Sequence, residues 1–170
     1  CRVAINLSPY QLRRPDLSVR IRDALERNSL QAAQLGCEIT ETAIMGDVEA
    51  SAGKLGRLRE MGIQIHVDDY GTGYSSLTYL HRFPITAIKI DRSFVAGLPA
   101  KHESDEVVKA IVSIAESLDF DVIAEGVEED GQATRLEELR CRYGQGHHLA
   151  PPMDAPALEA WVAARARSVA

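Results

Sequence analysis

Short apolar segments alternate with longer amphipathic segments along almost the whole chain. The apolar segments predict six β-strands, at 2–7, 36–41, 63–69, 87–91, 120–126 and 142–146. Five segments have helical spacing, at 17–28, 47–62, 103–119, 128–140 and 155–167. Strands that alternate with helices in this way build a parallel sheet from βα units. Because no internal repeat or linker is visible, the 170 residues predict one α/β domain or part of one.

Composition narrows the possible partners. The net charge of −6 argues against a nucleic acid polymer as ligand, because such binders are basic. A nucleotide held through metal ions remains compatible with this charge. Three cysteines without a CxxC spacing suggest neither a disulfide framework nor a zinc site, so reduced thiols are expected. With no apolar run of about 20 residues and no signal peptide, we expect a cytoplasmic domain, although an upstream segment could anchor a longer protein in a membrane.

Polar side chains recur in the last part of five predicted strands. They are Asn6, Glu38, Asp68, Lys89 and Glu125. In parallel α/β folds the ligand site lies at the carboxyl ends of the strands. A single carboxylate there is more often a solvated residue or a helix N-cap, and a single lysine is more often a salt-bridge partner. The recurrence on five strands favours one shared site, as in a barrel enzyme.

The residue types at these strand ends indicate a metal site. Asn6, Glu38, Asp68, Asp69 and Glu125 are oxygen donors, which suit Mg²⁺ or Mn²⁺ better than zinc. Several carboxylates at one place can hold two ions ~4 Å apart, the arrangement for in-line attack at phosphorus. The amino group at position 89 could position or activate a water, or neutralise developing charge.

Two further features leave alternatives open. The glycine-rich segment after Asp69 could be an ordinary turn or a functional lid. Three histidines are interpreted as structural: His66 as an interior histidine with satisfied hydrogen bonds, and the adjacent His147 and His148 as rim residues that do not share a metal.

Six motifs resemble those of the EAL domain, the family of bacterial cyclic-di-GMP phosphodiesterases. They are "NLSPYQL" (6–12), "EITET" (38–42), "VDDYGTGYSSL" (67–77), "IKIDRSFV" (88–95), "IAEGVEE" (123–129) and "YGQG" (143–146). Their order and spacing are family-like. The resemblance implies a (β/α)8 TIM-like barrel with one antiparallel strand, of which about six of eight strands are present. It also implies second-messenger hydrolysis of cyclic-di-GMP to linear pGpG with two Mg²⁺ or Mn²⁺ ions.

The resemblance also assigns roles to individual residues. It implies four metal ligands: Asn6, Glu38, Asp68 and Asp69. It implies three catalytic residues: Lys89, which would hold the attacking water, Glu125 and Gln145. Support of the substrate or of the loop is implied for a third set: Glu41, Gly71, Thr72, Gly73, Tyr74, Ser75 and Glu128. Within this set, Glu41 resembles the glutamate that anchors the loop, and it is expected to face away from Glu38 on an extended strand.

The chain departs from the family pattern in three places. The E-A-L segment, which would add a glutamate ligand and a nearby arginine, belongs upstream of residue 1. We therefore expect residues 1–170 to be the C-terminal portion of an EAL domain, lacking the first barrel strand or strands and weakly active or inactive alone. Tyr70 replaces the commoner phenylalanine. The segment "HHLAPP" (147–152) replaces an aromatic pattern, which weakens an expected contact with guanine.

Two other functions are compatible with these residues. One is a catalytically inactive EAL domain that acts as a cyclic-di-GMP receptor or a regulatory interaction module. A more distant one is another Mg²⁺-dependent barrel that acts on a small phosphate ester or an enolate. For the longer protein we expect an upstream sensor or GGDEF domain, with homodimerisation as a possible assembly.

Overall fold

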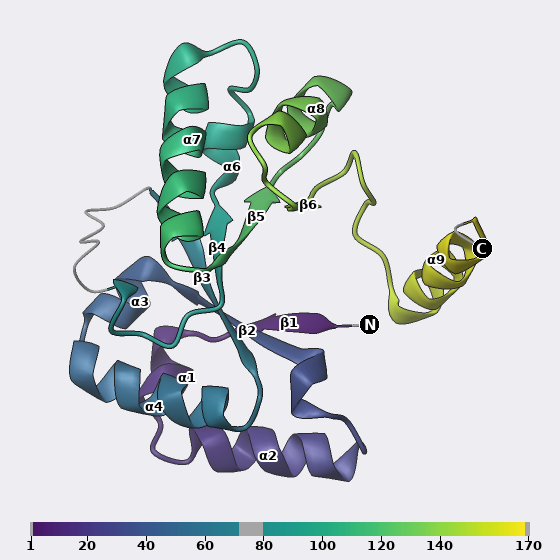
Figure 1. The fold of residues 1–170 in the computed structure, drawn as a ribbon. Helices are drawn as coiled ribbons and strands as arrows, with labels where there is room; N and C mark the ends of the chain where they lie inside the picture. Colours follow the sequence, from purple (N-terminus) through teal and green to yellow (C-terminus); the bar gives the residue numbers. More distant parts are fainter. Residues whose placement is uncertain (1, 72–79, 169–170) are drawn as a thin grey trace.

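A single parallel sheet organises the computed structural model, which describes residues 2–71 and 80–168. Its strands follow chain order: β1 (Val3–Asn6), β2 (Leu35–Thr40), β3 (Gln64–Tyr70), β4 (Ala87–Ile90), β5 (Asp121–Glu125) and β6 (Tyr143–Gln145). Every strand pairs in parallel with the next one along the chain (Figure 1). This half-barrel confirms the prediction of an incomplete TIM-like barrel with six strands. The antiparallel strand implied by the resemblance is not among these six.

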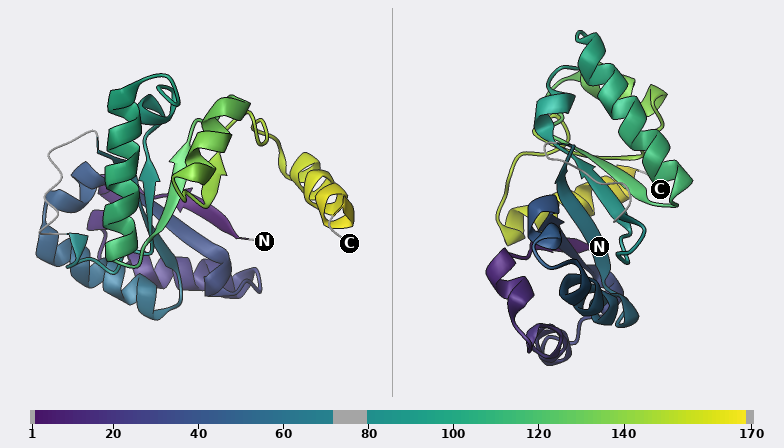
Figure 2. Two further views of the ribbon diagram at one scale, coloured as in Figure 1. Left: turned by 45° about the horizontal axis from the view of Figure 1, so that its top comes forward. Right: turned by 90° about the vertical axis from the view of Figure 1, so that its left-hand side faces the viewer.

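Helices follow the strands along the chain, and most of them cover the outer side of the sheet (Figure 1). They are α1 (Pro9–Arg13), α2 (Leu17–Arg27), the 3₁₀ helix η1 (Ala32–Gln34), α3 (Glu41–Met45), α4 (Val48–Glu60), α6 (Arg92–Val95), α7 (His102–Ser117), α8 (Asp130–Glu138) and α9 (Ala155–Ser168). Helix α4 packs on β3 and α2, whereas α7 packs on β4 and β5. Helix α9 extends away from the sheet (Figures 1 and 2).

The predicted long helices are all present, and the short ones were missed. Helices α1, α3, α6 and η1 span one turn or little more, too short for a hydrophobic period to show. For α1 the sequence did hold a signal. Ser8 and Gln11 form a capping box around Pro9, the pattern of a helix N-terminus.

Glu41 begins helix α3 instead of continuing strand β2. The strand ends at Thr40, which is the N-cap of that helix. The expectation that Glu38 and Glu41 face opposite ways on one strand is therefore wrong, because side chains alternate only within extended backbone. The Glu41 side chain is buried.

The two faces of the central strands differ as the sequence pattern predicts. Ile65 and Val67 of β3, with Ile88 and Ile90 of β4, are buried in the hydrophobic core beneath the helices. The opposite face of the same strands carries the ionisable side chains. In the part of the chain that the structure describes, no helix has the length and apolar character needed to cross a membrane.

Candidate active site

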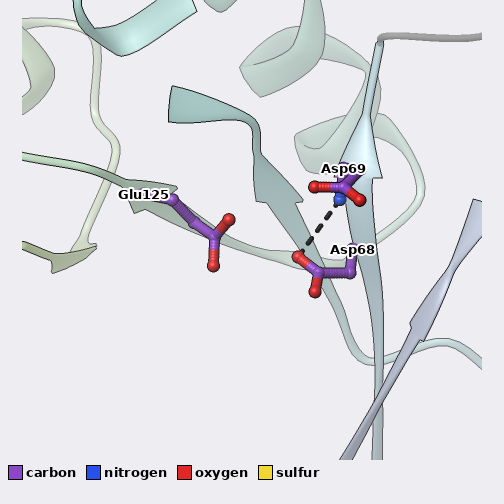
Figure 3. Close-up of side chains that lie close together, drawn as sticks. All are labelled: Asp68, Asp69 and Glu125. Atoms are coloured by element: carbon purple, nitrogen blue, oxygen red, sulfur yellow. Dashed lines mark hydrogen bonds between the residues drawn. The ribbon is translucent and has the colours of Figure 1, made fainter. Parts of the chain in front are cut away.

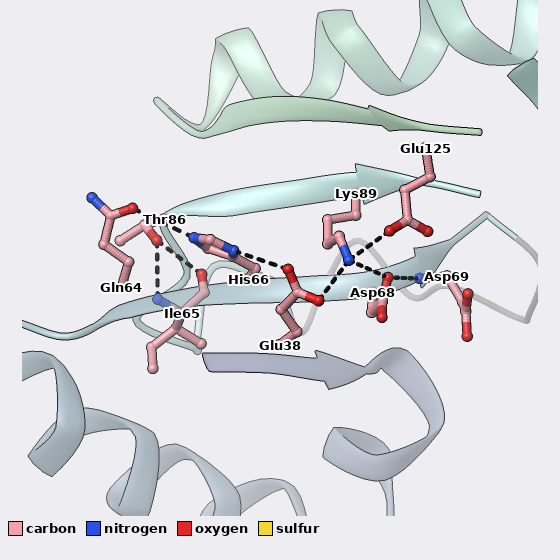
Figure 4. Close-up of polar contacts among 9 residues, drawn as sticks. All are labelled: Glu38, Gln64, Ile65, His66, Asp68, Asp69, Thr86, Lys89 and Glu125. Carbon is pink, nitrogen blue, oxygen red and sulfur yellow. Dashed lines mark hydrogen bonds and ion pairs between the residues drawn. The ribbon is translucent and has the colours of Figure 1, made fainter. Parts of the chain in front are cut away.

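Lys89 lies at the centre of a polar cluster on the inner face of the half-barrel. Its Nζ is 2.7 Å from Glu38 Oε2, 3.2 Å from Asp68 Oδ1 and 2.5 Å from Glu125 Oε1. Strands β2, β3 and β5 thus each bring one carboxylate to an ammonium group on β4 (Figure 4). The structure therefore brings together four of the five side chains that the sequence placed at strand ends.

An irregularity in strand pairing brings Asp69 to the same site as Asp68. Neighbouring residues of a regular strand point to opposite faces. Here the register between β3 and β4 shifts between Val67 and Tyr70, and Asp69 has a φ of 55°. Such a bulge re-aims a side chain, and aspartate tolerates the left-handed region better than most residues. The Asp69 backbone N–H donates to Asp68 Oδ1 at 3.1 Å, which holds the pair in place.

Asp68, Asp69 and Glu125 form a compact acidic group. One carboxylate oxygen from each lies within 4.8 Å of the others, with the three side chains directed toward a common space (Figure 3). Burial, followed by the Asp68 and Asp91 carboxylates, raises the pKa of Asp69. Burial also raises the pKa of Glu125, despite its ion pair with Lys89. These carboxylates crowd negative charge among hard oxygen donors, so they fit Mg²⁺ or Mn²⁺.

The charge states of Glu38 and Lys89 depend on each other. The His66 imidazole and the Lys89 ammonium hold the pKa of Glu38 below its ordinary value. The Lys89 contact is a formed hydrogen bond, whereas His66 Nδ1 stands 3.8 Å from Glu38 Oε1, beyond hydrogen-bond range. Burial alone would lower the pKa of Lys89, but its hydrogen bonds to Glu125 and Glu38 raise that pKa instead. Lys89 is therefore a cation and a hydrogen-bond donor here, and not a base.

Three other predicted residues lie around this cluster without touching it. Asn6 is the Cα partner of Glu38 across the β1–β2 pair, and Gln145 is the partner of Glu125 across the β5–β6 pair. Glu128 and Gln145 line one pocket of about 460 Å³. Among the described residues, the side chains of Asn6, Gln145 and Glu128 make no hydrogen bond or ion pair with the carboxylates around Lys89.

Four residues of the predicted loop lie outside the described residues: Thr72, Gly73, Tyr74 and Ser75. The predicted role of Glu41 as a loop anchor therefore stays a prediction. Gly71 is described and has a φ of 96°, a backbone conformation that favours glycine. A Cβ added there would also lie 3.1 Å from Phe94 Cε2, so the chain leaves β3 through a position suited to glycine.

Three residues near the site were missed or misread from the sequence. His66 is buried as predicted, but the expectation of satisfied hydrogen bonds is wrong, because its Nδ1 has no partner among the described residues. Arg92 lines the pocket beside Gln145. Asp91 accepts a hydrogen bond from the Ser93 backbone N–H at 2.9 Å and caps α6. An Asp followed two residues later by Ser was a usable signal for that cap.

His147 and His148 lie near different residues. His147 lines the pocket with Gln145, whereas His148 Nε2 lies 3.3 Å from Asp130 Oδ1 at the start of α8. The interpretation that the two histidines do not share a metal stays a prediction.

Comparison with known proteins decides the family. The model of the EAL domain matches residues 1–152. The chain belongs to the EAL domain family. This EAL domain is 42% identical over 163 residues to the cyclic di-GMP phosphodiesterase NbdA of Pseudomonas aeruginosa, covering 96% of the chain and 21% of NbdA. It spans about a fifth to a quarter of the length of the curated relatives that it matches.

Solved structures share the fold of this EAL domain, among them PaMucR and BlrP1. The PaMucR phosphodiesterase in complex with c-di-GMP superposes with a TM-score of 0.88 at 41% identity, covering 92% of this chain and 64% of that one. BlrP1 of Klebsiella pneumoniae, in a complex with manganese and cyclic-di-GMP, superposes with a TM-score of 0.79 at 32% identity, covering 85% of this chain and 37% of that one.

Proposed function

We propose that this EAL domain is the catalytic domain of a metal-dependent phosphodiesterase that hydrolyses cyclic-di-GMP to linear pGpG. The observation that carries the proposal is the cluster of Glu38, Asp68 and Glu125 around Lys89, with Asp69 turned into it by the bulge. The names of NbdA and of the c-di-GMP complex of PaMucR support the choice of substrate.

The proposed ligand set follows from donor chemistry. Glu38, Asp68 and Asp69, with Asn6 at the adjoining strand end, would hold two Mg²⁺ or Mn²⁺ ions. The manganese complex of BlrP1 supports this choice of ions. When bound, such ions polarise a phosphodiester and make a water molecule more acidic.

The remaining residues of the site would orient the reactants. Lys89, held as a cation by Glu38 and Glu125, would donate a hydrogen bond to the attacking water and offset charge that develops on the phosphate. Glu125 would accept a proton from that water, and burial has already raised the pKa of its carboxyl group.

The pocket beside β5 and β6 would hold part of the dinucleotide. Arg92, Glu128, Gln145 and His147 line it, and Gln145 is the Cα partner of Glu125. A guanidinium group suits a phosphate oxygen, whereas amide and carboxylate groups suit the hydrogen-bonding edge of guanine. Glu41 and the loop residues Gly71, Thr72, Gly73, Tyr74 and Ser75 would support the substrate.

The test measures hydrolysis by the complete gene product. Cyclic-di-GMP is incubated with the protein and Mn²⁺ or Mg²⁺, and pGpG is separated by chromatography. We expect turnover in the wild type and a loss of at least about 10³-fold in Asp68→Asn, which removes a carboxylate from the metal site. Absence of pGpG from the wild type in both ions would exclude the proposed activity.

An inactive receptor is the second candidate function. Its motivation is the 147–152 segment, because His147, Pro151 and Pro152 line the pocket where the resemblance expects an aromatic contact. Calorimetry with Ca²⁺ in place of Mg²⁺ separates the candidates when it is paired with the hydrolysis assay. Binding of cyclic-di-GMP without pGpG in Mn²⁺ supports a receptor, and absence of binding excludes it.

The surrounding protein is part of the same proposal. Because the chain spans only about a fifth to a quarter of the matched relatives, we propose a sensor or GGDEF domain elsewhere in the gene product, and a homodimer as its assembly. We also propose that the domain itself works in the cytoplasm.

A further inference from the structure

His66 belongs to the inner face of the half-barrel, although none of the roles above uses it. It lies on β3 two residues before Asp68, next to Glu38 in the polar cluster (Figure 4). The residue is 5% exposed, and its Nδ1 has no hydrogen-bond partner among the described residues. The nearest acidic atom is Glu38 Oε1 at 3.8 Å, while His66 Nε2 lies 3.4 Å from Gln64 Oε1.

The imidazole ring of His66 occupies space that is available because residue 36 is a glycine. Gly36 lies on β2, two residues before Glu38, and it faces the ring. A Cβ added at Gly36 would lie 2.9 Å from His66 Cε1 and 3.3 Å from Nε2. Glycine at this position therefore leaves the space that the ring occupies, and the ring is set with its Nδ1 side toward Glu38.

A hydrogen bond between His66 Nδ1 and Glu38 Oε1 would be energetically favourable. A buried polar nitrogen without a hydrogen-bond partner destabilises the fold, because it has lost its hydrogen bonds to water and gained none in return. The Glu38 carboxylate is a strong acceptor, and Lys89 occupies only its Oε2 atom, at 2.7 Å. A shift of about 1 Å brings Nδ1 and Oε1 into hydrogen-bond range. The two oxygens of Glu38 would then be held from opposite sides by His66 and Lys89.

We propose that His66 is a positioning residue that donates its Nδ1–H to Glu38 Oε1 and fixes this carboxylate for cation binding. The proposal rests on the proposed function only in taking Glu38 as a cation ligand. A neutral imidazole with its proton on Nδ1 has a free acceptor at Nε2. Gln64 Oε1 faces Nε2 in the structure, and a half-turn of the amide presents its NH₂ group to that acceptor, so Gln64 can accommodate this tautomer.

A matched pair of amide variants tests the Nδ1 donor. The Asn side chain can place its NH₂ group near the position of Nδ1, whereas the longer Gln side chain reaches the position of Nε2. Mn²⁺ affinity is measured by calorimetry on the complete gene product. We expect His66→Gln to weaken Mn²⁺ binding by about 10- to 100-fold, the usual effect of losing a partner of a metal ligand, and His66→Asn to retain most of the affinity.

The outcomes separate positioning from packing. Equal losses in the two variants, no loss in either, or a larger loss in His66→Asn would overturn the proposal, because a residue that merely fills space is replaced better by the larger glutamine than by asparagine. Thermal unfolding without metal is recorded for both variants to compare their folding.

If both variants unfold, a measurement on the wild-type protein still tests whether Nδ1 carries the proton. The ¹⁵N chemical shifts of the His66 ring report which nitrogen carries the proton, and a proton on Nε2 alone would overturn the proposal. Absence of Mn²⁺ binding by the wild type would overturn it together with the proposed function. Mn²⁺ affinity that depends on His66, in a protein that forms no pGpG, would contradict the proposed hydrolysis alone.

Discussion

The Lys89 ammonium lies between carboxylates. A divalent cation at this site would bind some of the same carboxylates. Lys89 Nζ touches Glu38, Asp68 and Glu125, and its side chain is only 3% exposed. A buried cation among three anions neutralises charge that would otherwise be costly in a dry environment. The same ammonium must repel an incoming Mg²⁺ or Mn²⁺, so stability without metal and metal affinity oppose each other at this residue.

Replacing Lys89 with Met separates these two effects. We expect Lys89→Met to bind Mn²⁺ at least about tenfold more tightly, because a repulsion of only 1.4 kcal/mol corresponds to that factor, while hydrolysis is lost. Calorimetry measures the affinity, and pGpG formation measures the activity. Lys109→Met is the control, since Lys109 pairs with Asp105 and Glu106 on α7. An affinity in Lys89→Met equal to that of the wild type would contradict the competition.

The acidic group predicts how metal binding depends on pH. The pKa values of Asp69 and Glu125 are raised. Without metal, these two groups therefore favour the folded state when protonated, and this contribution is lost as pH rises through their raised pKa values. Protons and cations compete for the same oxygens, so we expect Mn²⁺ affinity to fall as pH is lowered from about 7 toward about 4, and to begin falling at a higher pH than carboxyl groups with ordinary pKa values would cause. Calorimetry across this range measures the change.

Asp69→Asn is the matched variant for this pH dependence. It removes one of the two raised pKa values and keeps the shape of the side chain. We expect weaker Mn²⁺ binding at pH 7 and a shallower dependence on pH than in the wild type. If Mn²⁺ affinity depends on pH as steeply in the variant as in the wild type, groups other than Asp69 cause that dependence.

The sequence predicted which residues gather at the site better than it predicted their directions. Lys89 and Glu125 follow from the alternation of a regular strand. Asp69 does not, because its direction depends on the bulge, and the bulge arises from pairing with β4. The sequence also could not predict that His66 Nδ1 lacks a hydrogen-bond partner among the described residues, because the hydrogen bonds of a side chain depend on neighbours from other strands.

Helices α7 and α8 are joined by a charged contact that is largely shielded from solvent. Asp105 on α7 accepts hydrogen bonds from Arg135 on α8, at 2.6 and 3.0 Å, and lies 2.7 Å from Lys109 Nζ. The hydrogen bond with Arg135, followed by that with Lys109, holds the pKa of Asp105 well below its ordinary value. Because the folded-state pKa is depressed, this stabilisation is present above the unfolded pKa and is lost as pH falls.

Asp105→Asn tests that contact. We expect a lower free energy of unfolding than the wild type at pH 6. The difference should shrink as pH falls below about 4, where the aspartate of the unfolded chain becomes protonated. Urea denaturation of both proteins at pH 6, 4 and 3 measures this. A difference that stays constant over the range would show that Asp105 acts through packing and not through its charge.

Two glycines differ in the space available for a side chain, so they are expected to respond differently to the same substitution. A Cβ at Gly146 would lie 2.1 Å from the Val127 carbonyl oxygen, and backbone cannot move aside as a side chain can. A Cβ at Gly131, on α8, would lie 3.6 Å from Pro99 Cδ, an ordinary contact. We expect Gly146→Ala to destabilise the protein by about 1–3 kcal/mol. Gly131→Ala should be neutral or stabilise it by up to about 1 kcal/mol, because alanine is the better helix former. Thermal denaturation compares the two variants.

Strands and long helices could be located from the sequence, whereas helices of about one turn could not. The 16-residue helix α7 and the strands around the site were located within one or two residues, since their hydrophobic periods repeat several times. Helix α3 was missed, because its five residues hold little more than one turn. That omission produced the error about Glu41, because the alternation of side chains was extended by one residue beyond the end of the strand.

At the scale of the whole molecule, the sheet is open. Within the described residues, neither β1 nor β6 has a partner strand on its outer side. The parallel order of the strands could be predicted, because each βα unit constrains the next. The curvature that brings Glu38 near Glu125 could not be predicted from local patterns, because it is a property of the assembled sheet. Recognition of the family supplied the expectation of a barrel.

The open edge makes a prediction for the polypeptide of residues 1–170 in isolation. Val3 and Ile5 share one face of edge strand β1 and are 55% and 40% exposed. An edge with unpaired backbone groups and exposed aliphatic side chains favours pairing between molecules. We therefore expect this polypeptide to self-associate at micromolar concentration, as measured by sedimentation velocity.

Charged substitutions locate the surface responsible. Ile5→Lys should reduce the association at least about tenfold, because a lysine on an edge strand opposes pairing with a second edge. Leu30→Lys is the matched control, since Leu30 is also exposed but lies outside the sheet. The expectation fails if both lysine variants associate like the parent, or if the parent sediments as a monomer. An effect of Ile5→Lys alone would identify β1 as the edge through which the molecules join.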